Sequence, residues 1–100
     1  MGFDYSSSNG RWQALRSWAL RRDAFRCQYA KRFGRVEAAD VVHHIWPAEE
    51  FPEFAYCRWN LISLSKGSHN LMHKRGSKEL SEIGERLRLK TTPPRSDPIA

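Results

Sequence analysis

One hundred residues with a net charge of +6 are enough for one small, basic domain, whose core is thin for its surface. No run of about twenty apolar residues is present, which excludes a membrane-spanning helix, and residues 1–10 lack the apolar core of a signal peptide. We therefore expect a soluble, cytoplasmic protein.

The two cysteines, Cys27 and Cys57, are not part of any Cys-x-x-Cys pair. Two cysteines are too few for a disulfide framework, and they argue against a four-cysteine zinc site. We expect both thiols to be reduced.

The charge is distributed unevenly along the chain. Residues 11–35 carry eight basic side chains and one acidic one, whereas residues 36–60 carry one basic and five acidic side chains. The final forty residues return to a positive balance, with eight basic and four acidic side chains. A basic N-terminal third suits a polyanion such as DNA, but charge alone is weak evidence for binding.

The first predicted helix covers residues 10–22. Ser8-Asn9-Gly10 is a typical helix start, and Trp12, Leu15 and Ala19 recur at near-helical spacing after it. Residues 27–34 are expected to form a turn-containing connector between this helix and the next element.

Two strands and two further helices are predicted in the rest of the chain. Residues 36–46 are rich in valine, isoleucine and tryptophan, which is typical of a strand that Pro47 ends. The remaining elements are, in order, a loop over 48–59, a strand over 61–64, a helix over 68–75 that Gly76 ends, and a helix over 77–87. This order indicates a small α+β fold with a β-β-α unit at its centre.

The domain is expected to span residues 10–90. Residues 1–9 are polar and are expected to form a flexible N-terminus. Residues 91–100 contain three prolines and are expected to form a disordered tail.

All four histidines lie within the predicted β-β-α unit. His69 and His73 are four residues apart, so on a helix their side chains face the same way, with Cβ atoms about 5–6 Å apart. Two imidazoles so placed can both reach one metal ion at about 2.0–2.1 Å. Such a pair by itself is more often a solvated polar face.

The adjacent pair, His43 and His44, strengthens the metal hypothesis. Neighbouring side chains on a strand point to opposite faces, so these two histidines are not expected to bind the same ion. One of them can complete a three-histidine site with an open coordination position, and the other is then free to act as a base. Asn60, at the start of the second strand, could accept the second N–H of that base and fix its tautomer.

Three segments together resemble the HNH endonuclease family, and specifically its small phage-type members. The segments are residues 41–47 (VVHHIWP), 60–64 (NLISL) and 69–73 (HNLMH). The resemblance runs from about residue 12 to residue 87. It implies the ββα-metal core, also called the His-Me finger, with a flanking N-terminal helix and a C-terminal helix.

The resemblance also implies a role for each candidate residue. His44 matches the general base that activates water, and Asn60 matches the residue that orients this base. His43, His69 and His73 match the metal-ligand positions. The implied reaction is one-metal hydrolysis of DNA, which leaves 5′-phosphate and 3′-hydroxyl ends. Three imidazoles suit Zn, Ni, Mn or Co better than Mg, and the identity of the ion is left open among Zn, Mn, Ni and Mg.

The chain departs from the family at a second metal site. Many relatives bind a structural zinc through two Cys-x-x-Cys pairs, and the matching positions here are Cys27, Ala30, Ser65 and Ser68. No structural zinc is therefore expected, and aromatic packing should hold the core. The candidate core aromatics are Trp12, Trp18, Phe25, Phe33, Trp46, Phe54 and Trp59.

DNA is the implied partner, and the resemblance extends this to phage terminase and packaging proteins, in the host cytoplasm if the chain is phage-encoded. Arg21, Arg22, Lys74 and Arg75 are candidate DNA-backbone contacts, although a solvated surface charge with no DNA contact is as frequent for each residue.

Two alternatives to an endonuclease of low sequence specificity are a non-catalytic DNA-binding module and a structural zinc protein. A base with its own orienting residue favours the endonuclease. The oligomeric state and the choice between nicking and double-strand cleavage stay open.

Overall fold

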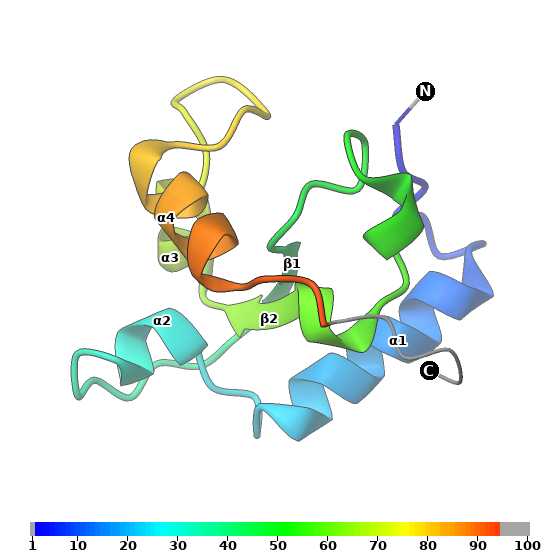
Figure 1. Ribbon diagram of the computed structural model, residues 1–100. Helices are drawn as coiled ribbons and strands as arrows, with labels where there is room; N and C mark the ends of the chain where they lie inside the picture. Colours follow the sequence, from blue (N-terminus) through cyan, green and yellow to red (C-terminus); the bar gives the residue numbers. More distant parts are fainter. Residues whose placement is uncertain (1, 95–100) are drawn as a thin grey trace.

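The computed structural model describes residues 2–94 (Figure 1). Its elements are, in chain order, α1 (Gly10–Arg22), α2 (Gln28–Lys31), β1 (Val41–His44), the 3₁₀ turns η1 (Pro52–Phe54) and η2 (Arg58–Asn60), β2 (Leu61–Leu64), α3 (Lys66–Leu71) and α4 (Glu82–Lys90). Within the described residues, no helix has both the length and the apolar character that a membrane crossing requires. Most of the tail that was expected to be disordered, residues 95–100, lies outside the described residues.

The two strands form an antiparallel hairpin at the centre of the fold. His43 lies opposite Ile62 and His44 lies opposite Leu61. Figure 1 shows α1 along one side of the hairpin and α3 with α4 on the other. The small α+β architecture with a β-β-α centre, which the sequence predicts, is confirmed.

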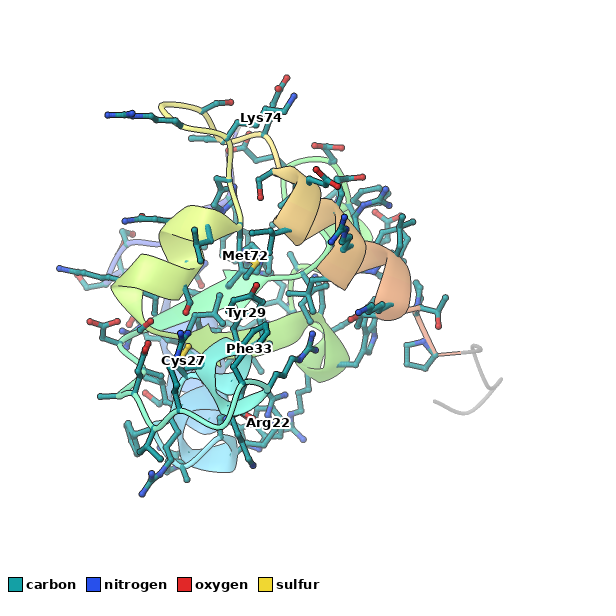
Figure 2. All side chains as sticks on the ribbon, turned by 90° about the vertical axis from the view of Figure 1, so that its left-hand side faces the viewer. Arg22, Cys27, Tyr29, Phe33, Met72 and Lys74 are labelled. Carbon is teal, nitrogen blue, oxygen red and sulfur yellow. The ribbon has the colours of Figure 1, made fainter. Side chains whose placement is uncertain are left out.

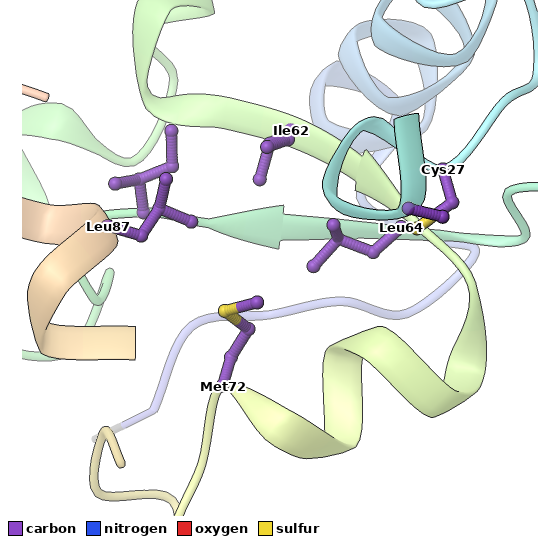
Figure 3. Close-up of a cluster of buried hydrophobic side chains, with 7 residues drawn as sticks. Cys27, Ile62, Leu64, Met72 and Leu87 are labelled. Atoms are coloured by element: carbon purple, nitrogen blue, oxygen red, sulfur yellow. The ribbon is translucent and has the colours of Figure 1, made fainter. Parts of the chain in front are cut away.

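The side chains of the hairpin alternate between two apolar clusters, as the two-residue period of a strand requires. The cluster on the side of α2, α3 and α4 contains Ile62, Leu64, Met72, Leu87 and Cys27, which converge in Figure 3. The cluster on the side of α1 contains Trp12, Ala19, Leu20, Ala39, Val42 and Leu61. Ile62, opposite His43, belongs to the first cluster, and Leu61, opposite His44, belongs to the second, so the two histidines have different neighbours.

The aromatic core is smaller than the sequence predicts. Of the seven aromatics expected in it, Trp12 is buried, but Phe25 and Phe33 keep 54% and 62% of their surface exposed. Phe25 lies in the turn after α1 with a φ of 56°, and Phe33 lies beside Tyr29 at the end of α2 (Figure 2). Aliphatic residues from β2 and α4 fill the interior instead.

The bounds of α1 and β2 agree with the sequence prediction, and those of four other segments differ. Residues 28–31 form a short helix, and the first strand covers only residues 41–44. The third helix begins two residues before the expected start, because the Ser65 side chain caps it by accepting from the backbone N–H of Ser68. It ends at Leu71, and the last helix begins at Glu82, after its N-cap Ser81.

The positions that match the cysteines of relatives do lie together in the fold. Cys27 is buried and its thiol lies beside Ser65, Ser68 and Ala30. Both cysteines are free thiols. That the chain folds without a structural zinc stays a prediction.

Candidate metal centre

Three histidines from three parts of the fold converge on one point. His43 lies on β1, His69 on α3, and His73 in the segment that follows α3. Their nearest ring nitrogens all lie within 4.8 Å of one another. The ring centroid of His43 is 5.3 Å from those of both His69 and His73, and the latter two are 5.0 Å apart. This is the spacing of side chains that can share one metal ion.

His43 has an unusual environment for a polar side chain. Its residue surface is 3% exposed, and among the described residues its Nε2 is the one buried side-chain nitrogen or oxygen without a hydrogen-bond partner. Burial, reinforced by His69 and His73, lowers the pKa of His43 well below 6.5. A buried, neutral imidazole with an unused lone pair is what a metal ligand requires, so the residues fit a divalent ion.

His73 is oriented by the backbone. Its Nδ1 lies 3.0 Å from the carbonyl oxygen of Lys78. Because a carbonyl only accepts, Nδ1 carries the proton and Nε2 keeps its lone pair. A backbone carbonyl that accepts from the protonated ring nitrogen commonly orients a histidine whose other nitrogen binds a metal.

The helical explanation for the His69–His73 pair is wrong. The third helix ends at Leu71, and His73 forms an isolated β-bridge with Leu80. Met72, between them, is 0% exposed and lies in the core (Figure 3). The carbonyl oxygens of Leu71 and Met72 accept hydrogen bonds from Ser81, so they do not continue the helix. The two rings nevertheless meet, because the bridge to Leu80 holds His73 beside the last turn of α3.

His44 lies on the other face of β1, outside the three-histidine group, and is surrounded by aromatic rings. Its imidazole stacks on Trp12 at 4.9 Å between centroids, and Phe3 packs edge-on at 5.1 Å. This burial lowers the pKa of His44 below its usual 6.5, even though the hydrogen bond to Ala55 opposes the shift. The ring is therefore neutral at physiological pH.

Hydrogen bonds fix the tautomer of His44. Its Nε2 lies 2.8 Å from the carbonyl oxygen of Ala55, so Nε2 donates and carries the proton. Its Nδ1 therefore has the lone pair, and the hydroxyl of Tyr5 lies 3.0 Å from it. The nitrogen available to a base mechanism is Nδ1.

Asn60 does not orient His44 in the way that the sequence analysis expects. Its Oδ1 accepts from the backbone N–H of Trp46 at 2.7 Å, and its Nδ2 donates to the carbonyls of Trp46 and Phe54 at 3.0 and 3.1 Å. The Asn60 amide thus ties together the two ends of the loop 47–59, through Trp46, and also binds Phe54 within the loop. This loop carries the Ala55 carbonyl that accepts from His44, so Asn60 is connected to His44 only indirectly.

Removing the Asn60 amide should destabilise the fold. In Asn60→Ala, two carbonyls and one N–H lose their partner at a site that is 0% exposed. Each such loss costs about 1–3 kcal/mol, so we expect a clear fall in the free energy of unfolding in urea. Asn70→Ala, on the exposed surface of α3, is the matched control and should change stability by about 0.5 kcal/mol or less. Equal stability of the two variants would show that the Asn60 network is unimportant.

One pocket is lined by His44 and by the three-histidine group. It encloses about 460 Å³, and all four histidines contribute to its walls. Tyr5, Glu49, Glu50 and Lys78 are among the other lining residues. Lys78 Nζ lies 3.2 Å from Glu49 Oε1, and this ion pair links the segment after β1 to the loop after His73. His44 and the three-histidine group therefore face the same space.

The four candidate DNA contacts have different surroundings. The Arg22 guanidinium forms intramolecular hydrogen bonds, because it donates to the Asp23 carboxylate and to the backbone carbonyls of Arg58 and Leu61. Arg21 is exposed on α1. Lys74, at the start of the loop that follows His73 (Figure 2), pairs with Glu79 at 3.2 Å and, with Arg75, lines a hollow next to His69 and His73.

Sequence reasoning missed three groups that touch the functional histidines. Two are the backbone carbonyls of Ala55 and Lys78, which leave no signal in residue type. The third is Tyr5, in a segment that the sequence predicts to be flexible. The structure places Phe3 and Tyr5 of this segment against His44.

A scan of protein-family models and a search of curated proteins found no match to this chain. Among solved structures, the chain is similar to the HNH endonuclease of the deep-sea thermophilic bacteriophage GVE2, crystallised with a manganese ion. The TM-score is 0.62 and the identity 27%, over 63% of this chain and 68% of that chain. The chain therefore has an HNH-type nuclease fold, and the likeness supports a nuclease function in general.

Proposed function

We propose that this chain, with its HNH-type nuclease fold, is a metal-dependent DNA endonuclease in which His44 is the general base. The observation that carries the proposal is the pairing within one pocket of a neutral base and a three-histidine cluster. Neither group alone would distinguish a nuclease from a structural site. A structural zinc site would need no additional neutral histidine beside its three ligands.

His43, His69 and His73 would hold one divalent ion. The ion, when bound, would offset the negative charge that develops on the phosphate and on the leaving 3′ oxygen. Three neutral imidazoles favour Mn, Zn or Ni over Mg. The manganese ion in the similar phage enzyme supports Mn as the first ion to test.

His44 would take the proton of the attacking water at Nδ1. The burial that lowers its pKa keeps this nitrogen unprotonated, and the Ala55 carbonyl accepts from Nε2 throughout. The same carbonyl stabilises the imidazolium that forms, because it accepts a charge-assisted hydrogen bond. The products would be a 5′-phosphate and a 3′-hydroxyl.

DNA is the proposed substrate, bound with low sequence specificity. The net charge of +6 supports a polyanionic partner, and Arg21, Lys74 and Arg75 are the proposed phosphate contacts. We extend the proposal to a role in phage DNA processing with packaging proteins as partners, which is supported by the phage origin of the similar enzyme.

A non-catalytic DNA-binding module is the second candidate. The observation that favours it is the Tyr5 hydroxyl on His44 Nδ1, because this contact occupies the nitrogen that a base would use. The two candidates differ in whether His44 matters for DNA cleavage.

The chemistry of the cut ends tests the proposed reaction. Hydrolysis with the 3′ oxygen as leaving group should give fragments that DNA ligase rejoins without prior phosphatase or kinase treatment. An end-labelled duplex, cleaved in the presence of Mn and incubated with ligase, provides the measurement. Fragments that ligase rejoins only after 3′-phosphatase and kinase treatment would contradict this direction of cleavage.

A further inference from the structure

The segment before α1 makes a contact that the proposed mechanism does not use. Phe3 and Tyr5 pack edge-on at 4.7 Å, and both rings also contact Trp12 at 5.4 Å. From this cluster the Tyr5 hydroxyl reaches Nδ1 of His44 at 3.0 Å. Burial, together with the nearby Glu49 carboxylate, raises the pKa of Tyr5 to about 12. The hydroxyl is therefore protonated and is the donor in this hydrogen bond.

Only one partner fits on the basic nitrogen of His44. Since Nε2 donates to Ala55, the acceptor capacity of the ring is the single lone pair of Nδ1. The Tyr5 hydroxyl uses this lone pair. An attacking water must donate to the same lone pair in order to lose its proton to His44. The phenol and the water therefore exclude one another.

We propose that Tyr5 is a gate on the catalytic base: its hydroxyl caps Nδ1 of His44 in the resting protein and must leave before water can be activated. This inference rests on the proposed role of His44. It adds a residue outside the three segments that resemble the family, and it assigns the N-terminal segment a direct influence on cleavage.

The gate can open without unfolding of the segment. The segment is held to α1 through backbone atoms, because Gln13 donates to the carbonyls of Tyr5 and Ser6 and Asn9 donates to that of Asp4. Tyr5 keeps 52% of its residue surface exposed, although its hydroxyl is desolvated beside His44, and it lines the pocket. A rotation of this one side chain into the pocket opening would uncover Nδ1 while the backbone stays in place.

Tyr5→Phe tests the gate because it removes the hydroxyl and keeps the ring. We expect kcat/KM for cleavage of a plasmid in the presence of Mn to rise about two- to tenfold, the ratio that corresponds to one neutral hydrogen bond. Tyr29→Phe, which removes a hydroxyl on α2 outside the pocket, is the control and should leave the rate unchanged. An unchanged or lower rate for Tyr5→Phe would overturn the gate; a lower rate would indicate that Tyr5 relays the proton.

A second measurement needs no nuclease activity and separates the gate from the proposed function. Diethyl pyrocarbonate acylates unprotonated imidazole nitrogens, and fragment mass spectra locate the label. At one fixed pH and without metal, we expect His44 to be acylated about two- to tenfold faster in Tyr5→Phe than in the wild type, with Tyr29→Phe as the control. Equal rates would overturn the gate. Faster acylation together with an absence of cleavage in every variant would support the cap and reject the nuclease.

Discussion

Replacement of His44 by glutamine is expected to lower the rate of DNA cleavage about 10²- to 10⁴-fold, the usual contribution of a general base. The glutamine Nε2 can take the place of the histidine Nε2 and donate to the Ala55 carbonyl, so the loop 47–59 keeps its contact. No basic nitrogen remains at the position of Nδ1. Initial rates of plasmid cleavage at saturating Mn provide the measurement.

His44→Ala should abolish cleavage as well, but at a cost in stability. The alanine leaves a void beside Trp12 and Phe3 and removes the donor to Ala55. Both variants should bind metal as the wild type does, because His44 lies outside the three-histidine group. Cleavage by the glutamine variant at the wild-type rate would show that another group acts as the base.

Replacement of His73 by alanine is expected to weaken metal binding at least about 100-fold. Loss of a group that merely orients a ligand costs about 10- to 100-fold in affinity, and loss of the ligand itself should cost more. His73 is preferable to His43 for this test, because His43 is 3% exposed and its removal would leave a void in the interior. Calorimetric titration of the metal-stripped protein with Mn or Zn measures the affinity.

The matched control for the metal titration is His44→Gln, which changes a histidine of the same pocket outside the ligand group. It should retain the wild-type affinity. If His73→Ala bound the ion as tightly as this control, the three-histidine centre would be the wrong assignment. Circular dichroism of both variants establishes that the fold is intact before the titration.

The meeting of the three histidines illustrates what a local pattern can predict. The alternation of a strand predicts that His43 and His44 face opposite sides, and the structure places His43 beside His69 and His73 but His44 against Trp12 and Phe3. The convergence of His69 and His73 was predicted for the wrong reason. A spacing of four residues indicates a helix, but α3 ends at Leu71, where Ser81 binds the carbonyl oxygens of Leu71 and Met72. The bridge between His73 and Leu80 depends on the tertiary fold.

Asn60 and Tyr5 show where sequence reasoning ends. An asparagine at a strand entry is compatible with many acceptors and donors, and only the fold selects the backbone of Trp46 and Phe54. The true acceptor for His44 is a backbone carbonyl, for which residue 55 could be almost any amino acid. Tyr5 lies thirty-nine residues from His44 in a polar segment without periodicity, so no local pattern connects the two.

The most direct test of the central claim is plasmid cleavage by the metal-stripped protein, with Mn, Mg, Ni and Zn added back singly. His44→Gln is run beside the wild type at each metal. We predict that supercoiled plasmid is nicked or linearised only when a metal is present, and that the variant leaves it intact. DNA that the wild type binds but does not cut with any of the four ions would contradict the endonuclease assignment and favour the non-catalytic module.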